Sequence, residues 1–92
     1  MSFYLKDPGS RIDYAIDWAP YLDGQEIEAS LWTVAPDEEG GIAVEEASFT
    51  IVRSAARLAG GLPGHSYSVT NRVTLTDGSV DERSLALRVE QR

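Results

Sequence analysis

The sequence has 92 residues, which suits one domain with a single hydrophobic core and leaves no room for a second. It contains no cysteine and one histidine, His65, which excludes a disulfide framework, a thiolate zinc site and a cysteine nucleophile and argues against a transition-metal site built from side chains. Fifteen acidic residues outnumber eight basic ones, giving a formal net charge of −7, and such a surface repels the phosphates of nucleic acid.

Residues 1–9 precede the first predicted strand and contain three consecutive apolar side chains, Phe3, Tyr4 and Leu5. We predict an N-terminal arm whose apolar residues dock on a neighbouring protein or add to the edge of a sheet. The alternative is that this arm folds back on its own domain, which spans residues 10–92. The segment lacks a basic stretch followed by an apolar one, so it predicts no secretory signal and indicates folding in a cytoplasm.

The first strand is predicted over residues 11–18, where apolar and charged positions alternate with a period of two. The apolar face ends with Trp18, for which core packing is the simplest interpretation. Ala19-Pro20 ends the strand because proline cannot donate a hydrogen bond to the ladder. Tyr21-Leu22 then lies in a loop, where the pair either caps the core or projects outward, so Tyr21 is a candidate interface residue.

The next strand begins after an Asp23-Gly24 turn, and its alternation leaves the position of Trp32 open. If Ile27, Ala29 and Leu31 face the core, Trp32 points outward. Either a bulge shifts the register and buries Trp32, or the tryptophan is displayed on the sheet surface. Because tryptophan is enriched in binding hot spots, Trp32 is a candidate interface residue.

The middle of the chain is its least regular part. Residues 34–41 form a loop by composition, and the apolar positions between Ile42 and Ile51 indicate two short strands or one bent strand. Alternation resumes between Ser54 and Leu58, over a segment too short to assign as a helix.

The last third of the chain predicts a β-hairpin. Apolar residues alternate with polar ones from Tyr67 to Leu75, and Asp77-Gly78 is a strong hairpin turn because both residues tolerate positive φ. The odd positions of residues 85–89 form the inward face of the final strand. Asn71 is the polar exception on an apolar face, where it either bonds backbone at a bulge or marks the rim of the core.

About seven short strands, separated by turn signals and without a persuasive helix, predict an all-β fold: an immunoglobulin-like or fibronectin type III-like β-sandwich. The segment from Leu62 to Val69 resembles the stretch that enters the sixth strand of fibronectin type III domains. There, a tyrosine closes the corner by bonding its hydroxyl to upstream backbone. We therefore predict that Leu62 plugs one end of the core and that Tyr67 forms this structural corner.

No group of residues predicts catalysis or cofactor binding. Asp13 and Asp17 share a strand face but lie roughly 13 Å apart at the rise of a strand, too far for a pair of glycosidase carboxylates. Ser66 follows His65, yet neighbouring strand residues point to opposite sides, so they form no nucleophile–base dyad. The acidic loop lacks calcium-loop spacing, and no apolar run approaches the roughly 20 residues that span a bilayer. We predict a binding protein with no catalytic residue, metal, cofactor or membrane contact.

A series of short motifs extends over most of the chain: Lys6-Asp7-Pro8, Asp13-Tyr14, Asp17-Trp18, Tyr21-Leu22, Glu26-Ile27 and Asp81-Glu82-Arg83-Ser84. In their order and spacing these motifs resemble a group of short phage and prophage proteins described as fibre–tail adaptor or tail-associated proteins with an immunoglobulin-like fold. The similarity runs from about Lys6 to Val89, and residues 36–56 depart from it.

The resemblance implies a virion structural protein without enzymatic activity, which contacts other phage tail or fibre proteins. It also implies a location in the virion tail after synthesis in the bacterial host cytoplasm, with several copies around a symmetric tail as a homo-oligomer. The alternative hypothesis is a carbohydrate- or surface-binding module in which Tyr21 and Trp32 stack on sugar rings.

Overall fold

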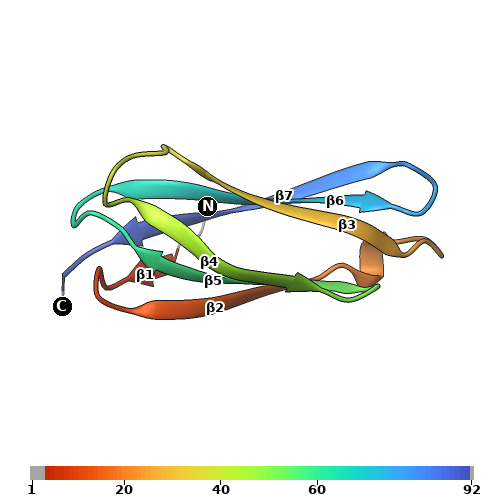
Figure 1. The fold of residues 1–92 in the computed structure, drawn as a ribbon, viewed down its shortest axis with the longest axis horizontal. Helices are drawn as coiled ribbons and strands as arrows, with labels where there is room; N and C mark the ends of the chain where they lie inside the picture. Colours follow the sequence, from red (N-terminus) through yellow and green to blue (C-terminus); the bar gives the residue numbers. More distant parts are fainter. Residues whose placement is uncertain (1–3, 92) are drawn as a thin grey trace.

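The computed structural model describes residues 4–91 and contains seven strands in two packed sheets (Figure 1). The four-stranded sheet has the order β1-β7-β6-β3, and the three-stranded sheet has the order β2-β5-β4. The molecule is elongated, with principal extents of 42 × 25 × 19 Å. The elements are β1 (Tyr4–Lys6), β2 (Arg11–Asp17), the 3-10 helix η1 (Ala19–Tyr21), β3 (Ile27–Ala35), β4 (Ile42–Phe49), β5 (Arg53–Gly60), β6 (Ser66–Leu75) and β7 (Val80–Val89).

The β6–β7 hairpin confirms the prediction for the last third of the chain. Tyr67 pairs with Leu87 and Val69 with Leu85, and all four side chains are buried. Gly78 adopts φ +87° in the connecting turn, a backbone conformation that glycine adopts without steric cost. The hairpin supplies the two inner strands of the larger sheet, so its alternating apolar face makes up much of the core.

The three-stranded sheet is built on β5, which pairs antiparallel with β2 on one side and with β4 on the other. The structure resolves the middle of the chain as one strand, β4, with a register shift between Val44 and Glu46 that makes it irregular. The predicted alternation of β5 is confirmed, because Ser54, Ala56 and Leu58 are buried.

A β-bulge in β3 decides which face carries Trp32. Ile27 pairs with Leu75 and Ala29 with Thr74, so Glu28 is an extra residue without a partner across the ladder. Beyond this bulge the faces exchange: Leu31 is 57% exposed and Trp32 only 9%. Of the two alternatives left open by the sequence, the shifted register with a buried Trp32 is therefore correct, and Ala29 and Leu31 do not face the core.

A chain of hydrogen bonds crosses the core between the two sheets. Trp18 Nε1 donates to Asn71 Oδ1 at 2.9 Å, and Asn71 Nδ2 donates to Ser30 Oγ at 2.9 Å. The hydroxyls of Ser30 and Ser54 lie 2.7 Å apart, and Trp32 Nε1 donates to Ser54 Oγ at 3.0 Å. Asn71 and Ser54 are fully buried, and within residues 4–91 no buried side-chain polar atom lacks a partner.

Strand β1 closes the edge of the larger sheet by pairing parallel with the end of β7. Its last residue, Lys6, is 1% exposed, and its ammonium donates to the carbonyl oxygens of Asp7, Ser10 and Gly60 at 2.9, 2.6 and 2.8 Å. Burial lowers the pKa of this ammonium. Residues 4–6 of the predicted arm thus lie on their own domain, while Phe3 falls outside the described residues.

Candidate functional site

The two strand-face carboxylates, Asp13 and Asp17, both accept hydrogen bonds within the domain. Asp13 accepts a hydrogen bond from Arg57 Nε at 2.9 Å, and this bond and the guanidinium charge lower the pKa of the Asp13 carboxyl. Across residues 4–91 no group of three or more His, Cys, Asp or Glu side chains is placed to hold a metal ion. No helix in the described chain has the length and apolar character needed to cross a membrane.

Tyr67 lies at the centre of a hydrogen-bonded corner. Its hydroxyl accepts the Leu62 N–H at 3.0 Å and donates to Glu38 Oε1 at 2.6 Å. His65 Nδ1 lies 2.9 Å from the same carboxylate oxygen, and the imidazole stacks on the Tyr67 ring. The Tyr67 and His65 hydrogen bonds lower the pKa of Glu38, while burial and the Glu38 contact raise the pKa of Tyr67. The single histidine is therefore a corner residue beside a carboxylate, with no serine hydroxyl in the group.

Two of the candidate interface residues lie on β1, where Tyr4 is 54% and Leu5 47% exposed. The Tyr4 ring makes an edge contact with Tyr14, with centroids 5.7 Å apart. Tyr4 and Tyr14 line a hollow together with Ser68 of β6 and residues 83–86 of β7. Among the described residues β1 pairs only with Leu87–Val89, so the earlier part of β7 borders this hollow without a strand partner on that side.

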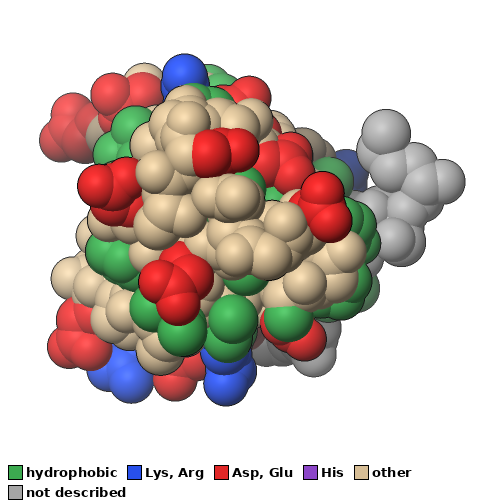
Figure 2. Space-filling model, turned by 90° about the vertical axis from the view of Figure 1, so that its right-hand side faces the viewer, with side chains coloured by type: hydrophobic (Ala, Val, Ile, Leu, Met, Phe, Trp, Pro, Cys, Tyr) green, Lys and Arg blue, Asp and Glu red, His purple; other side chains and the backbone are tan. Residues whose placement is uncertain are grey.

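Tyr21 lies on η1, at the end of the sandwich that carries the β6–β7 turn (Figure 1), which we call the hairpin end (residues 17–28, 49–54 and 74–83). Tyr21 is 52% exposed, its ring makes an edge contact with Trp18, and the Arg83 guanidinium lies 5.2 Å from the ring centroid. The adjacent Leu22 is buried, so the predicted pair divides: Leu22 caps the core and Tyr21 projects outward. Figure 2 looks onto this end, where acidic side chains are spread among apolar ones.

Trp32 is not part of any of these surfaces. Because the bulge turns it inward, its ring lies in the core 6.3 Å from Tyr14, and its indole N–H is bonded to Ser54. Its candidacy as an interface residue is corrected accordingly. The sugar-stacking alternative required Tyr21 and Trp32 on display together, and only Tyr21 is exposed.

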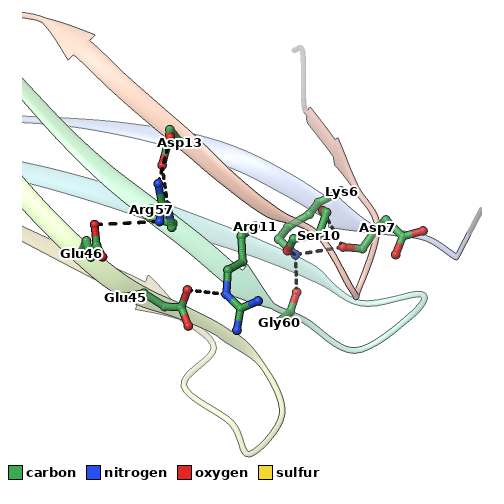
Figure 3. A network of polar contacts seen from close by, with 9 residues as sticks. All are labelled: Lys6, Asp7, Ser10, Arg11, Asp13, Glu45, Glu46, Arg57 and Gly60. Atoms are coloured by element: carbon green, nitrogen blue, oxygen red, sulfur yellow. Dashed lines mark hydrogen bonds and ion pairs between the residues drawn. The ribbon is translucent and has the colours of Figure 1, made fainter.

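The outer face of the three-stranded sheet carries exposed ion pairs (Figure 3). Arg57 on β5 lies between Asp13 on β2 and Glu46 on β4, and Arg11 Nε lies 2.7 Å from Glu45. Beside the Arg57 row, Ala15, Ala55 and Ser48 are cross-strand neighbours and form the floor of a shallow hollow. Water and salt screen exposed pairs of this kind, so this face adds little to stability.

Sequence reasoning missed two side chains that hold these regions in place. Lys6 was placed in the N-terminal arm with no role of its own. A lysine is almost never fully buried unless its charge is paired, and here three carbonyl oxygens accept hydrogen bonds from the ammonium. Glu38 was grouped with a solvated acidic loop, although it is the partner of both Tyr67 and His65. The separation of 29 residues between Glu38 and Tyr67 leaves no local signal for the contact.

Comparison with known proteins identifies a family that the sequence matches. Residues 6–88 match a family model described as Gp77, podophage GP4 fiber-tail adaptor protein gp77. The match covers nearly the same stretch as the resemblance noted in the sequence, which it confirms. A search of curated proteins finds no match.

Proposed function

The chain belongs to the podophage fiber-tail adaptor family, and on that premise we propose that it is a non-enzymatic structural protein of the virion tail that joins fibre and tail components through protein–protein contacts. The family match over residues 6–88 is the observation that carries the proposal. The family implies a tail location and binding to other tail or fibre proteins. Synthesis in the bacterial host cytoplasm before assembly is part of the same proposal.

The strand order supports placing the fold among the immunoglobulin-like sandwiches. In a constant-type immunoglobulin domain, strands B, E and D form one sheet together with A, and C, F and G form the other. Here β2-β5-β4 has the order B-E-D and β3-β6-β7 the order C-F-G, with β1 added parallel to the last strand. The Tyr67 hydroxyl bonded to Leu62 has the form of a tyrosine corner.

The exposed candidate interface residues lie in two regions that adjoin at Arg83, which lines the hollow beside Tyr4 and lies over the Tyr21 ring. Tyr4 and Leu5 lie on β1, and Tyr21 lies at the hairpin end. We propose that several copies assemble around the symmetric tail, so that burial at assembly adds to the stability of a small domain.

The direct test is incorporation into particles. Particles produced from a genome lacking the gene, and particles from the complemented genome, are purified and compared by mass spectrometry and electron microscopy. We expect the complemented particles to contain the protein and the deletion particles to lack fibres. Absence of the protein from purified complemented particles, or normal fibres without it, would refute the proposal.

A further inference from the structure

We infer that the hairpin end is a docking surface for a tail or fibre protein that presents Lys or Arg side chains beside apolar ones. The inference rests on the proposed adaptor function and adds the surface and the chemistry of the partner. The exposed apolar side chains at this end indicate a binding surface, and the charge around them indicates which class of protein binds there.

The exposed apolar side chains are concentrated at the hairpin end. Of the eight large apolar residues exposed within residues 4–91, five lie here: Tyr21, Phe49, Ile51, Val52 and Val80. Single exposed apolar residues are ordinary, whereas five of them on the segments that form one end of the molecule are typical of an interaction surface.

The segments that carry these residues are held together by backbone hydrogen bonds. The Val52 carbonyl accepts the Trp18 N–H and the Ile51 carbonyl accepts the Ile27 N–H, both at 2.9 Å. Thr76 N donates to the Glu26 carbonyl at 3.0 Å, which ties the β6–β7 hairpin to the start of β3. The surface is therefore formed in the free protein, and binding does not require these segments to be ordered first.

Charge at this end has one dominant sign. Residues 17–28, 49–54 and 74–83 carry seven carboxylates and two arginines, a net of −5 of the −7 for the whole chain. One of the two arginines, Arg83, lies over the Tyr21 ring. The acidic side chains are spread over the end, among and around the apolar ones (Figure 2).

This combination selects the class of partner. A second copy docked end to end would bring two surfaces of net −5 together, and like charges placed opposite each other at an interface repel. Nucleic acid is repelled for the same reason. A protein surface with basic residues around an apolar centre satisfies both features, because apolar contact gives affinity and opposite charge gives orientation and a fast association rate.

The charge is tested with two double variants that change the net charge equally. Glu26→Lys with Glu28→Lys alters the hairpin end, and Asp37→Lys with Glu39→Lys alters the β3–β4 loop elsewhere on the molecule. In the described structure none of these four side chains makes a hydrogen bond or ion pair, so both variants are expected to fold. The apolar part is tested by Ile51→Ser, with Leu31→Ser as its control, since the two side chains are 54% and 57% exposed.

The probe is a tail particle purified from phage that lack the gene, mixed with each purified variant and sedimented. We expect Glu26→Lys with Glu28→Lys to lower the affinity about tenfold or more, with a smaller loss for Ile51→Ser and none for the two controls. We also expect wild-type binding to weaken as salt rises. Thermal unfolding of each variant verifies that it is folded.

The sedimentation results distinguish a failure of the hairpin-end docking surface from a failure of the adaptor function on which it rests. If the wild-type protein binds the particles and the hairpin-end variants bind equally well, the inference is wrong and the adaptor function stands. An equal loss in the control variants also overturns it, because the effect then follows total charge or total apolar area. If the wild-type protein does not bind, both proposals fall.

Discussion

At the scale of single residues, the core is held in register by polar groups as well as by apolar packing. Asn71 accepts from Trp18, which follows a strand of the opposite sheet, and donates to Ser30 and the Leu31 carbonyl in its own sheet. A buried polar group is costly unless it is bonded, so these partners favour one alignment of the two sheets over slipped ones. The sequence marks Asn71 as an exception on an apolar face, but it does not identify its partners, which lie about 40 and 53 positions away.

Replacement of Asn71 by leucine tests this arrangement. Asn71→Leu removes the acceptor of the Trp18 indole N–H, which remains buried and unpaired, and we expect a loss of about 1–3 kcal/mol of unfolding free energy or more. Urea unfolding followed by far-UV circular dichroism measures it. Ser68→Ala on the exposed face of the same strand is the control, with an expected change within about 0.5 kcal/mol. Equal stability of Asn71→Leu and wild type would contradict a structural role for the bond network.

The Glu38 carboxylate at the Tyr67 corner makes the stability of the fold depend on pH. The pKa of Glu38 is lowered in the folded protein by its Tyr67 and His65 hydrogen bonds, so the unfolded chain binds its proton at higher pH than the folded one. The stabilisation that ionised Glu38 gives the folded state is therefore complete above the usual glutamate pKa of about 4.3. It is lost as the pH falls through the lowered pKa of Glu38 in the folded protein.

Glu38→Gln removes this titration. We expect the variant to be less stable than wild type at pH 7, with the difference narrowing as the pH drops below about 4. Thermal unfolding between pH 3 and 7 (roughly the window in which carboxyls titrate) measures both curves. The neighbour Glu39→Gln is the control, and a pH-independent gap between wild type and Glu38→Gln would show that the carboxylate charge is not the cause.

At the scale of elements, alternation predicts the strands well where one face is uniformly apolar. The inward faces of β2, β6 and β7 agree with the structure, since Ile16, Val69 and Leu85 are buried as expected. In β3 the alternation misleads, because Ala29 and Leu31 continue the apolar pattern of Ile27 although the bulge has exchanged the faces. A bulge adds one residue without a distinct composition, so sequence leaves both registers open.

Two neighbouring substitutions test the register of β3. Trp32→Ala removes a buried ring and should cost about 3–5 kcal/mol of unfolding free energy, whereas Leu31→Ala should change it by no more than about 0.5 kcal/mol. Urea unfolding followed by circular dichroism compares them. If Leu31→Ala costs as much as Trp32→Ala, the bulge is misplaced and the original alternation holds.

At the scale of the whole molecule, the all-β class follows from the sequence, whereas the exposed apolar residues follow only in part. Tyr4, Leu5 and Tyr21 were identified as candidates and are exposed, because terminal and loop positions need no strand register to be assigned. The exposed apolar residues of the hairpin end lie on three segments distant in sequence, which the structure joins by backbone hydrogen bonds.

The shared core predicts a single cooperative transition. Trp18 and Trp32 are both buried and each bonds to a residue of the opposite sheet, so indole fluorescence reports on the closure of the sandwich. We expect unfolding curves from fluorescence and far-UV circular dichroism to coincide in urea, as for a two-state domain. Separate midpoints for the two signals would mean that the sheets open before the strands are lost.

The buried position of Lys6 has a practical consequence for studies of the assembled particle. It is the only lysine in the sequence, and its ammonium is enclosed by three carbonyl oxygens. Amine-directed cross-linkers and dyes will therefore find no accessible lysine side chain while β1 remains docked. Reagents that react with carboxylates are therefore needed to map the neighbours of this protein. The rate at which Lys6 is acylated will report how often β1 detaches from β7.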